Sequence, residues 1–168
     1  MRSPSTLTRD GEQVLNFDSY LLHLLSTFSN RVKAISSSQY LSQYELGSVE
    51  MRIIASLAFR PQQKAAEVCE LISVDKGAAS RAINRLEKRG LVTSDSPSGR
   101  QKRWILNDAG WQLHRDFLQL VLAREAELYA GISDAELSQF HLTLNKLSHN
   151  LALLEQSIEL VKGVTDAN

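Results

Sequence analysis

The sequence has very little cysteine, proline and glycine, and each shortage excludes something. Cys69 is the only cysteine among 168 residues, so an internal disulfide and a zinc site made of several thiolates are both excluded. With three prolines and eight glycines, few positions interrupt a helix, and we expect a mainly α fold. A length of 168 residues fits one domain, or one domain with long helical extensions.

Long apolar runs and catalytic motifs are also absent. A membrane-spanning helix needs about 18 consecutive apolar residues, and no run in this sequence approaches that length. Residues 1–9 lack the apolar centre of a signal peptide. The four histidines show no metal-ligand spacing, and there is no glycine-rich phosphate loop or nucleophile elbow. We expect a cytoplasmic protein that is not an enzyme, holds no metal or cofactor and contacts no membrane.

The charge is balanced overall but unevenly distributed. The chain has 19 Lys and Arg and 19 Asp and Glu. Residues 76–103 hold eight of the basic residues and only two acidic ones, Glu87 and Asp95, which leaves eleven basic against seventeen acidic residues elsewhere. This local excess predicts an electropositive face that attracts an anionic partner. An ordinary solvated surface is the alternative.

Both ends of the chain are predicted to form long helices with apolar stripes. Residues 1–10 are polar and are expected to be a flexible tail. A helix is expected from Gly11 to about Ser37, followed by a linker over residues 36–43. Its stripe consists of Val14, Phe17, Leu21, Leu24, Phe28, Val32 and Ile35.

Two more helices are expected after residue 107. The first runs to about residue 130, and the second follows a capping box made by Ser133 and Glu136. Its apolar positions keep coiled-coil spacing over more than three heptads: Leu137, Phe140, Leu144, Leu147, Leu151, Leu154, Ile158 and Val161. A stripe of this length predicts packing against further helices, and we expect a homodimer.

The middle of the chain has the spacing of a helix-turn-helix. A helix over residues 48–60 is followed by helices over 64–72 and 76–89, the last capped by Asp75 and ended by Gly90. A β-hairpin is expected next, with strands over residues 91–93 and 100–106 joined by a turn rich in Ser, Pro and Gly. Trp104 and Leu106 should lie on one face of the return strand.

The helix over 76–89 buries Ala79, Ile83 and Leu86, so its opposite face should be exposed. That face carries Lys76, Gly77, Ser80, Arg81, Asn84 and Lys88, with Ala78 and Arg85 at its flanks. Arginine can hydrogen-bond guanine at two points, and asparagine can do so with adenine. Together with the basic hairpin residues Arg100, Lys102 and Arg103, this face predicts a double-stranded DNA-binding site.

Two segments resemble the winged-helix core of the MarR (multiple antibiotic resistance regulator) family of transcription factors. Residues 74–92, VDKGAASRAINRLEKRGLV, are similar to the family's recognition helix and first wing strand, and residues 99–110, GRQKRWILNDAG, to its wing and following helix. The resemblance implies a winged helix-turn-helix over residues 46–107. It also implies dimerisation regions over 11–45 and 108–162, with a short tail over 163–168.

The family's functional residues carry over onto specific positions. The resemblance places Ser80 and Arg81 where the family reads the major groove, and Arg100 where a wing arginine enters the minor groove. This sequence departs from the pattern at Ser98, where an Asp usually braces that arginine, and at Asn107, where the family usually has Thr. The resemblance implies a homodimeric regulator of transcription. It is expected to act as a repressor on a pseudo-palindromic operator and to be released by a small effector.

Three alternatives stay open at this point. The chain could be a winged-helix protein-interaction module without specific DNA binding, although it keeps Arg81 and the basic wing. Cys69 could be a redox switch, but its place on an apolar helix face favours a buried structural thiol. Tyr40, Tyr44 and Phe28 could line a pocket for a small aromatic or phenolic effector, although aromatic residues at helix junctions usually serve packing.

Overall fold

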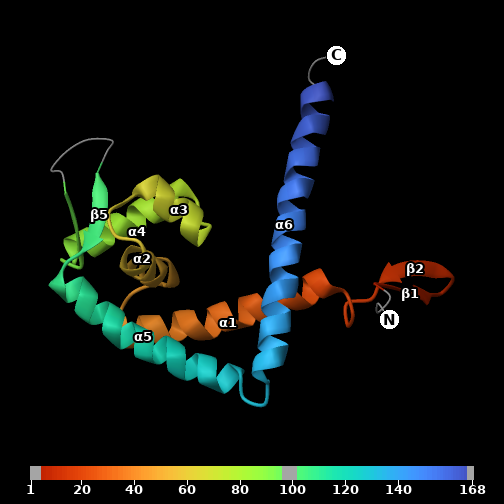
Figure 1. Cartoon of the computed structure of the whole chain (residues 1–168), viewed down its shortest axis with the longest axis horizontal. Helices are drawn as coiled ribbons and strands as arrows, with labels where there is room; N and C mark the ends of the chain where they lie inside the picture. Colours follow the sequence, from red (N-terminus) through yellow and green to blue (C-terminus); the bar gives the residue numbers. More distant parts are fainter. Residues whose placement is uncertain (1–4, 96–101, 166–168) are drawn as a thin grey trace. The chain divides into compact units, whose positions relative to one another are not determined.

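The computed structural model describes residues 5–95 and 102–165, with side chains up to Ile158. The chain divides into two compact units, residues 1–119 and 120–168, and α5 runs from the first into the second. The fold is mainly α with small antiparallel sheets, which confirms the expected fold class (Figure 1). The elements are β1 (Thr6–Arg9), β2 (Glu12–Leu15), α1 (Leu21–Tyr44), α2 (Ser48–Phe59), β3 (Gln63–Lys64), α3 (Ala65–Ile72), α4 (Lys76–Lys88), β4 (Val92–Ser94), β5 (Arg103–Leu106), α5 (Asp108–Leu128) and α6 (Asp134–Thr165).

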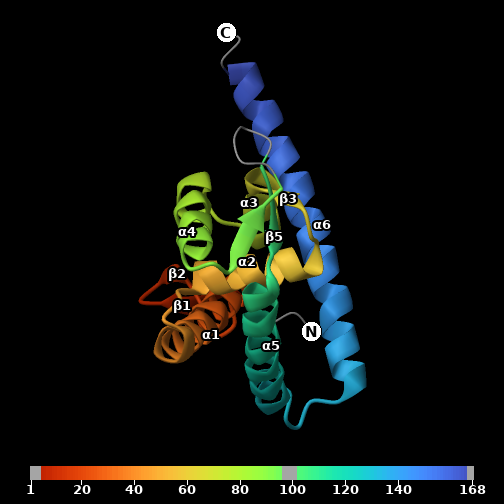
Figure 2. The ribbon, with the colours of Figure 1, turned by 90° about the vertical axis from the view of Figure 1, so that its left-hand side faces the viewer.

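The core of the first unit is built around α2. This helix packs against α1, α3, α4 and β5, so apolar residues occur on several of its faces (Figure 2). Met51, Ile53 and Ile54 are fully buried. Val68 from α3 and Leu86 from α4 complete this core and are also fully buried. The helices of the helix-turn-helix therefore bury their apolar side chains against one another, within one chain.

The wing is part of a three-stranded antiparallel sheet in the order β3-β5-β4. Trp104 lies opposite both Gln63 and Ser94, and Leu106 lies opposite Val92. Trp104 and Leu106 are buried, as the alternation in the sequence predicts. Strand β3 was not predicted, because the sequence pattern assigned Lys64 to the following helix and a two-residue strand has no periodicity of its own.

Both ends of α4 and the start of α5 are held by hydrogen bonds or by close backbone contact. The Asp75 carboxylate accepts a hydrogen bond from the Ala78 amide at 2.8 Å, which confirms the predicted cap of α4. At the other end, the Asn107 side-chain amide donates to the Gly90 carbonyl at 2.7 Å. Gly110, in the first turn of α5, lies so close to the main chain that an added Cβ would be 2.0 Å from the Leu91 carbonyl oxygen.

The N-terminal segment differs from the prediction. Residues 6–9 and 12–15 form a β-hairpin rather than a flexible tail and the start of a helix, and α1 begins at Leu21 instead of Gly11. Asp10 and Gly11 both have positive φ in the turn, the conformation that a two-residue hairpin turn requires. The Asp-Gly pair between β-forming residues was the local signal, and the helical spacing of Val14 and Phe17 was coincidental.

The predicted linker over residues 36–43 is also wrong, because α1 continues through it to Tyr44. Ser36 is buried, and its hydroxyl donates to the Val32 carbonyl at 2.7 Å, so the side chain is satisfied within the helix. Tyr40 is buried and packs edge-on against Phe117 of α5, with ring centroids 5.3 Å apart. Tertiary packing here overrides the weak helix propensity of a serine-rich segment.

The second unit contains the end of α5 and the whole of α6. The predicted capping box is confirmed, since the Glu136 carboxylate accepts from both the amide and the hydroxyl of Ser133, at 2.9 and 2.6 Å. These hydrogen bonds lower the pKa of Glu136. The helix continues to Thr165, so it extends beyond residue 163, where a tail was expected.

Candidate nucleic-acid interface

Helix α4 has one buried face and one exposed face. Ala79, Ala82, Ile83 and Leu86 are each at most 2% exposed, and they fix α4 against α2 and α3. The other face is exposed at all the predicted positions except Ala78, which is half-buried: Lys76, Gly77, Ser80, Arg81, Asn84, Arg85 and Lys88. The structure thus brings the predicted residues of this helix onto one surface.

The exposed polar residues of α4 differ in whether they have partners. Lys76, Ser80, Arg81, Asn84 and Lys88 make no side-chain hydrogen bond or ion pair with any residue in the described part of the chain. The Arg81 guanidinium passes close to Gly77, where an added Cβ would be 3.2 Å from its nitrogen. The small residue therefore leaves room for the arginine, and these five side chains are available to an external partner.

Arg85 is held by its own protein. Its guanidinium forms an ion pair with the carboxylate of Glu50 in the first turn of α2. Glu50 is buried, while most of the Arg85 side chain is exposed. Arg85 was predicted at the flank of the exposed face, because a helical projection shows the direction of a side chain but not its partner on another helix.

The described wing residues are also engaged within the protein. The Lys102 ammonium lies 3.7 Å from the Glu87 carboxylate and 5.2 Å from the centre of the Trp104 ring. The Arg103 guanidinium donates to the Gln62 carbonyl at 2.9 Å, which helps to hold β3 beside β5. Arg100 and Ser98 lie outside the described residues.

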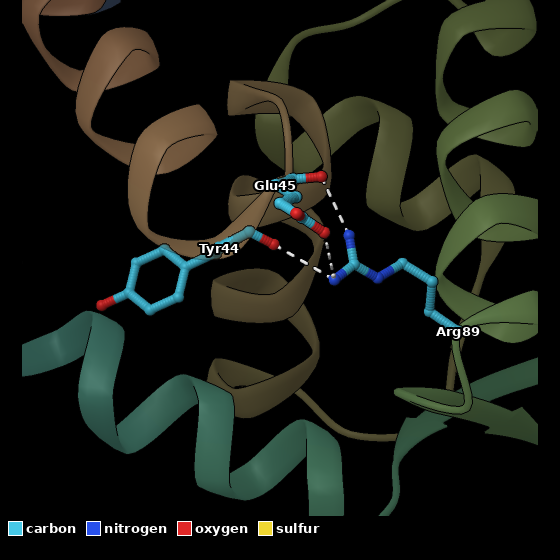
Figure 3. Close-up of polar contacts among 3 residues, drawn as sticks. All are labelled: Tyr44, Glu45 and Arg89. Atoms are coloured by element: carbon cyan, nitrogen blue, oxygen red, sulfur yellow. Dashed lines mark hydrogen bonds and ion pairs between the residues drawn. The ribbon is translucent and has the colours of Figure 1, made fainter.

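Arg89 follows α4 and connects it to α1, a contact that the sequence analysis missed. Its guanidinium donates to the carbonyl oxygens of Glu45 at 2.9 Å and Tyr44 at 3.2 Å, as Figure 3 shows. Glu45 has a positive φ of 54° and ends α1. A cation at a helix C-terminus satisfies free carbonyls and the helix dipole, so Arg89 caps a helix that is distant in sequence.

The aromatic residues considered for an effector pocket lie in different environments. The Tyr44 ring points away from the guanidinium toward α5 (Figure 3). Burial raises the pKa of the Tyr44 hydroxyl, with additional contributions from Asp116 and Tyr40. Tyr40 packs against Phe117, whereas Phe28 is exposed. Cys69 is buried, in agreement with the structural interpretation of this thiol.

The described residues contain neither a cluster that could hold a metal ion nor a helix that could cross a membrane. Over residues 5–95 and 102–165, no group of three or more His, Cys, Asp or Glu side chains is arranged to hold a metal ion. In the same ranges, no helix combines the length and the apolar character needed to cross a membrane.

A helix-turn-helix followed by a β-hairpin defines the winged-helix class of protein. Within this class, residues 44–103 match the model of the MarR family. This match covers the winged helix-turn-helix and agrees with the resemblance seen in the sequence.

The solved structures that it resembles have the same fold. A MarR/EmrR family transcriptional regulator from Acinetobacter sp. ADP1 is 23% identical, with a TM-score of 0.75 over 83% of this chain and 99% of that one. MepR of S. aureus in complex with DNA is 18% identical, with a TM-score of 0.67 over 77% and 95% of the two chains. FabT of Streptococcus pneumoniae, also in complex with DNA, is 21% identical, with a TM-score of 0.65 over 80% and 96%.

Proposed function

We propose that this protein is a sequence-specific DNA-binding regulator of transcription that acts as a homodimer on a pseudo-palindromic operator. The observation that carries the proposal is the unpaired face of α4. Ser80, Arg81 and Asn84 are exposed there without partners among the described residues, and these residue types can hydrogen-bond base edges in the major groove. Lys76 and Lys88 add positive charge at the two ends of the same face.

The two similar structures solved with DNA support this assignment. MepR and FabT share the fold over more than three quarters of this chain and are bound to DNA. In a winged helix-turn-helix the second helix enters the major groove, which is the role we assign to α4. We assign minor-groove or phosphate contact to Arg100 of the wing, together with Lys102 and Arg103.

The homodimer is supported by the apolar side chains that α1 and α6 leave exposed. On α1, Phe28 and Ile35 are each more than half exposed. On α6 the exposed positions include Phe140, Leu144, Leu151, Leu154 and Ile158. Helices with this much apolar surface are stabilised by association, and a two-fold dimer presents two copies of α4 to two half-sites.

The remaining parts of the proposal rest on the match of residues 44–103 to the MarR family. We propose that the dimer works in the cytoplasm as a repressor and that a small aromatic or phenolic molecule releases it from DNA. Titrating the protein–DNA complex with phenol and with benzoate tests the release, and fluorescence anisotropy of a labelled duplex measures it. If the anisotropy stays unchanged at high concentrations of phenol and of benzoate, the proposed release by small aromatic or phenolic molecules is refuted.

Selection from random duplexes tests the DNA-binding proposal directly. The wild type should enrich a pseudo-palindrome with half-sites about 10 bp apart, one helical turn. Arg81→Ala should lose discrimination worth about 1–3 kcal/mol at one base position of each half-site. Arg31→Ala, which makes the same change at an exposed position of α1, is the matched control. Enrichment of no sequence by the wild type would favour a protein-interaction module instead.

A further inference from the structure

Among the residues that the structure describes, Glu50 is the only charged side chain that is buried. It lies in the first turn of α2 and is only 3% exposed. The positive end of the helix dipole favours a carboxylate at this position, but removing a charge from water remains costly unless a partner compensates it. The neighbouring core residues Met51, Ile53 and Ile54 are apolar and provide no compensation.

The compensating charge comes from the DNA-facing helix. Arg85 of α4 is the only cation in the described part of the chain that lies within ion-pair distance of Glu50. The side-chain exposures are 65% for Arg85 and 4% for Glu50, so the guanidinium covers the carboxylate from the solvent side. Arg85 therefore differs from Arg81 and Lys88 on the same helix, which have no such partner among the described residues.

Gly47 provides the space that this pair occupies. A Cβ at position 47 would lie 2.8 Å from the Glu50 carboxylate oxygen Oε2. The backbone of Gly47 has φ −79° and ψ 168°, a conformation that alanine adopts freely. The glycine is thus required by the position of the Glu50 carboxylate and not by the backbone.

We propose that Glu50 is a specificity-determining residue, because it neutralises Arg85 and holds its guanidinium away from the DNA phosphates. This inference rests on the proposed DNA-binding function. A free cation on α4 would bind phosphates of any sequence and raise non-specific affinity. Because Glu50 pairs with Arg85, one cation fewer binds phosphates. A larger share of the binding free energy then comes from the side chains that contact bases.

The salt dependence of binding to a random-sequence duplex tests this role. The slope of log affinity against log salt is about −0.9 for each phosphate that a protein neutralises. Glu50→Gln should release Arg85 and steepen the slope by about 0.9, so that raising salt from about 50 to 200 mM weakens binding about 3.5-fold more than in the wild type. Glu50→Gln/Arg85→Gln should restore the wild-type slope, because the released cation is gone.

Glu70→Gln is the matched control. Glu70 is an exposed carboxylate on α3, so its replacement changes the net charge by the same amount without releasing Arg85, and the slope should stay at the wild-type value. The ratio of operator to random-sequence affinity should fall in Glu50→Gln alone. Thermal melting of every variant establishes that it is folded before binding is compared.

Gly47→Ala provides a second route to the same state. The new methyl group should push the Glu50 carboxylate off Arg85 and steepen the slope, and it should add nothing in the Glu50→Gln/Arg85→Gln background. If Glu50→Gln does not fold, the slope measured for Gly47→Ala tests whether release of Arg85 steepens the salt dependence.

Equal slopes for the wild type and Glu50→Gln overturn the proposal, whether or not the double variant differs. If Glu50→Gln does not fold, equal slopes for the wild type and Gly47→Ala overturn it. A steeper slope that persists in the double variant also overturns it, since the extra contact would not come from Arg85. Absence of any DNA binding by the wild type is a different result and would remove the proposed function itself.

Discussion

The winged helix and the terminal helices use similar amounts of apolar sequence but bury it very differently. In the winged helix, Met51, Ile54 and Leu86 are fully buried within the chain. On the terminal helices, Ile35 of α1 and Leu151 of α6 are more than half exposed. The hydrophobic pattern alone does not distinguish these regions, because periodicity identifies a face to be covered and not the molecule that covers it. One region closes on itself, whereas the other requires a second copy in our proposal.

The largest contrast is expected from the same substitution made in both regions. Ile54→Ala removes a fully buried side chain and should lower the free energy of unfolding by about 2–5 kcal/mol. Ile35→Ala should cost less and should act through the dimer, so its effect should depend on protein concentration. Urea unfolding followed by circular dichroism, at two protein concentrations, measures both. Equal losses of unfolding free energy in the two variants, unchanged by protein concentration, would contradict the comparison.

The next effect concerns association. Leu151→Asp together with Leu154→Asp places charges on an apolar face of α6 where both leucines are exposed, so the dimer should dissociate while the winged helix stays folded. Sedimentation velocity at micromolar concentration gives the mass, and circular dichroism reports the helix content. Asn150→Asp, a new carboxylate at an exposed position beside this face, should remain a dimer. A monomeric wild type would refute the dimer.

Loss of a helix cap should change the free energy of unfolding less than the substitutions above. The change should be similar in the two regions. Asp75→Ala removes the cap of α4, and Ser133→Ala removes the cap of α6. Each should lower the free energy of unfolding by about 1 kcal/mol. Only Asp75→Ala should also weaken operator binding, because α4 faces the DNA in our proposal. Similar operator affinities for the two variants would show that α4 needs no cap to bind.

The smallest expected effect is a pH dependence at His114 on α5. Burial lowers its pKa below the ordinary value of 6.5, and Arg115 adds to the shift. Its Nδ1 atom is buried without a hydrogen-bond partner in the part of the chain that the structure describes. Because the folded pKa is depressed, the native state binds fewer protons than the unfolded state, and stability should decline as pH falls through and below 6.5. The melting temperature of His114→Asn should vary less between pH 7.5 and 5.5, and an unchanged profile would exclude His114.

Much of the fold was predictable because local signals and tertiary packing agree there. Asp75 and Ser133 cap the helices that the sequence assigned to them, and Trp104 and Leu106 lie on the buried side of the wing. The prediction failed at the N-terminus, where two sequence signals conflicted. Apolar residues at helical spacing continued through an Asp10-Gly11 turn, and the turn determined the structure.

The candidate site was predictable only as a set of exposed residues. Helical periodicity placed Ser80, Arg81 and Asn84 on the outer face, and the structure agrees. The partners of Arg85 and Arg89 could not be predicted, because Glu50 and Glu45 belong to other helices and only the packing of α4 against them sets those distances. The number of positive charges along a helix therefore does not tell how many of them are available to an external partner.

Gly110 limits how far this sequence can diverge while keeping its fold. The atom that an added Cβ would meet, at 2.0 Å, is the main-chain oxygen of Leu91, and no change of rotamer can move it aside. Neighbouring side chains can be exchanged for others of similar volume, but even a single methyl group at position 110 would separate α5 from the first residues of the wing. In a library of wing variants, this position should be held constant, and its glycine should survive selection among sequences that share little else.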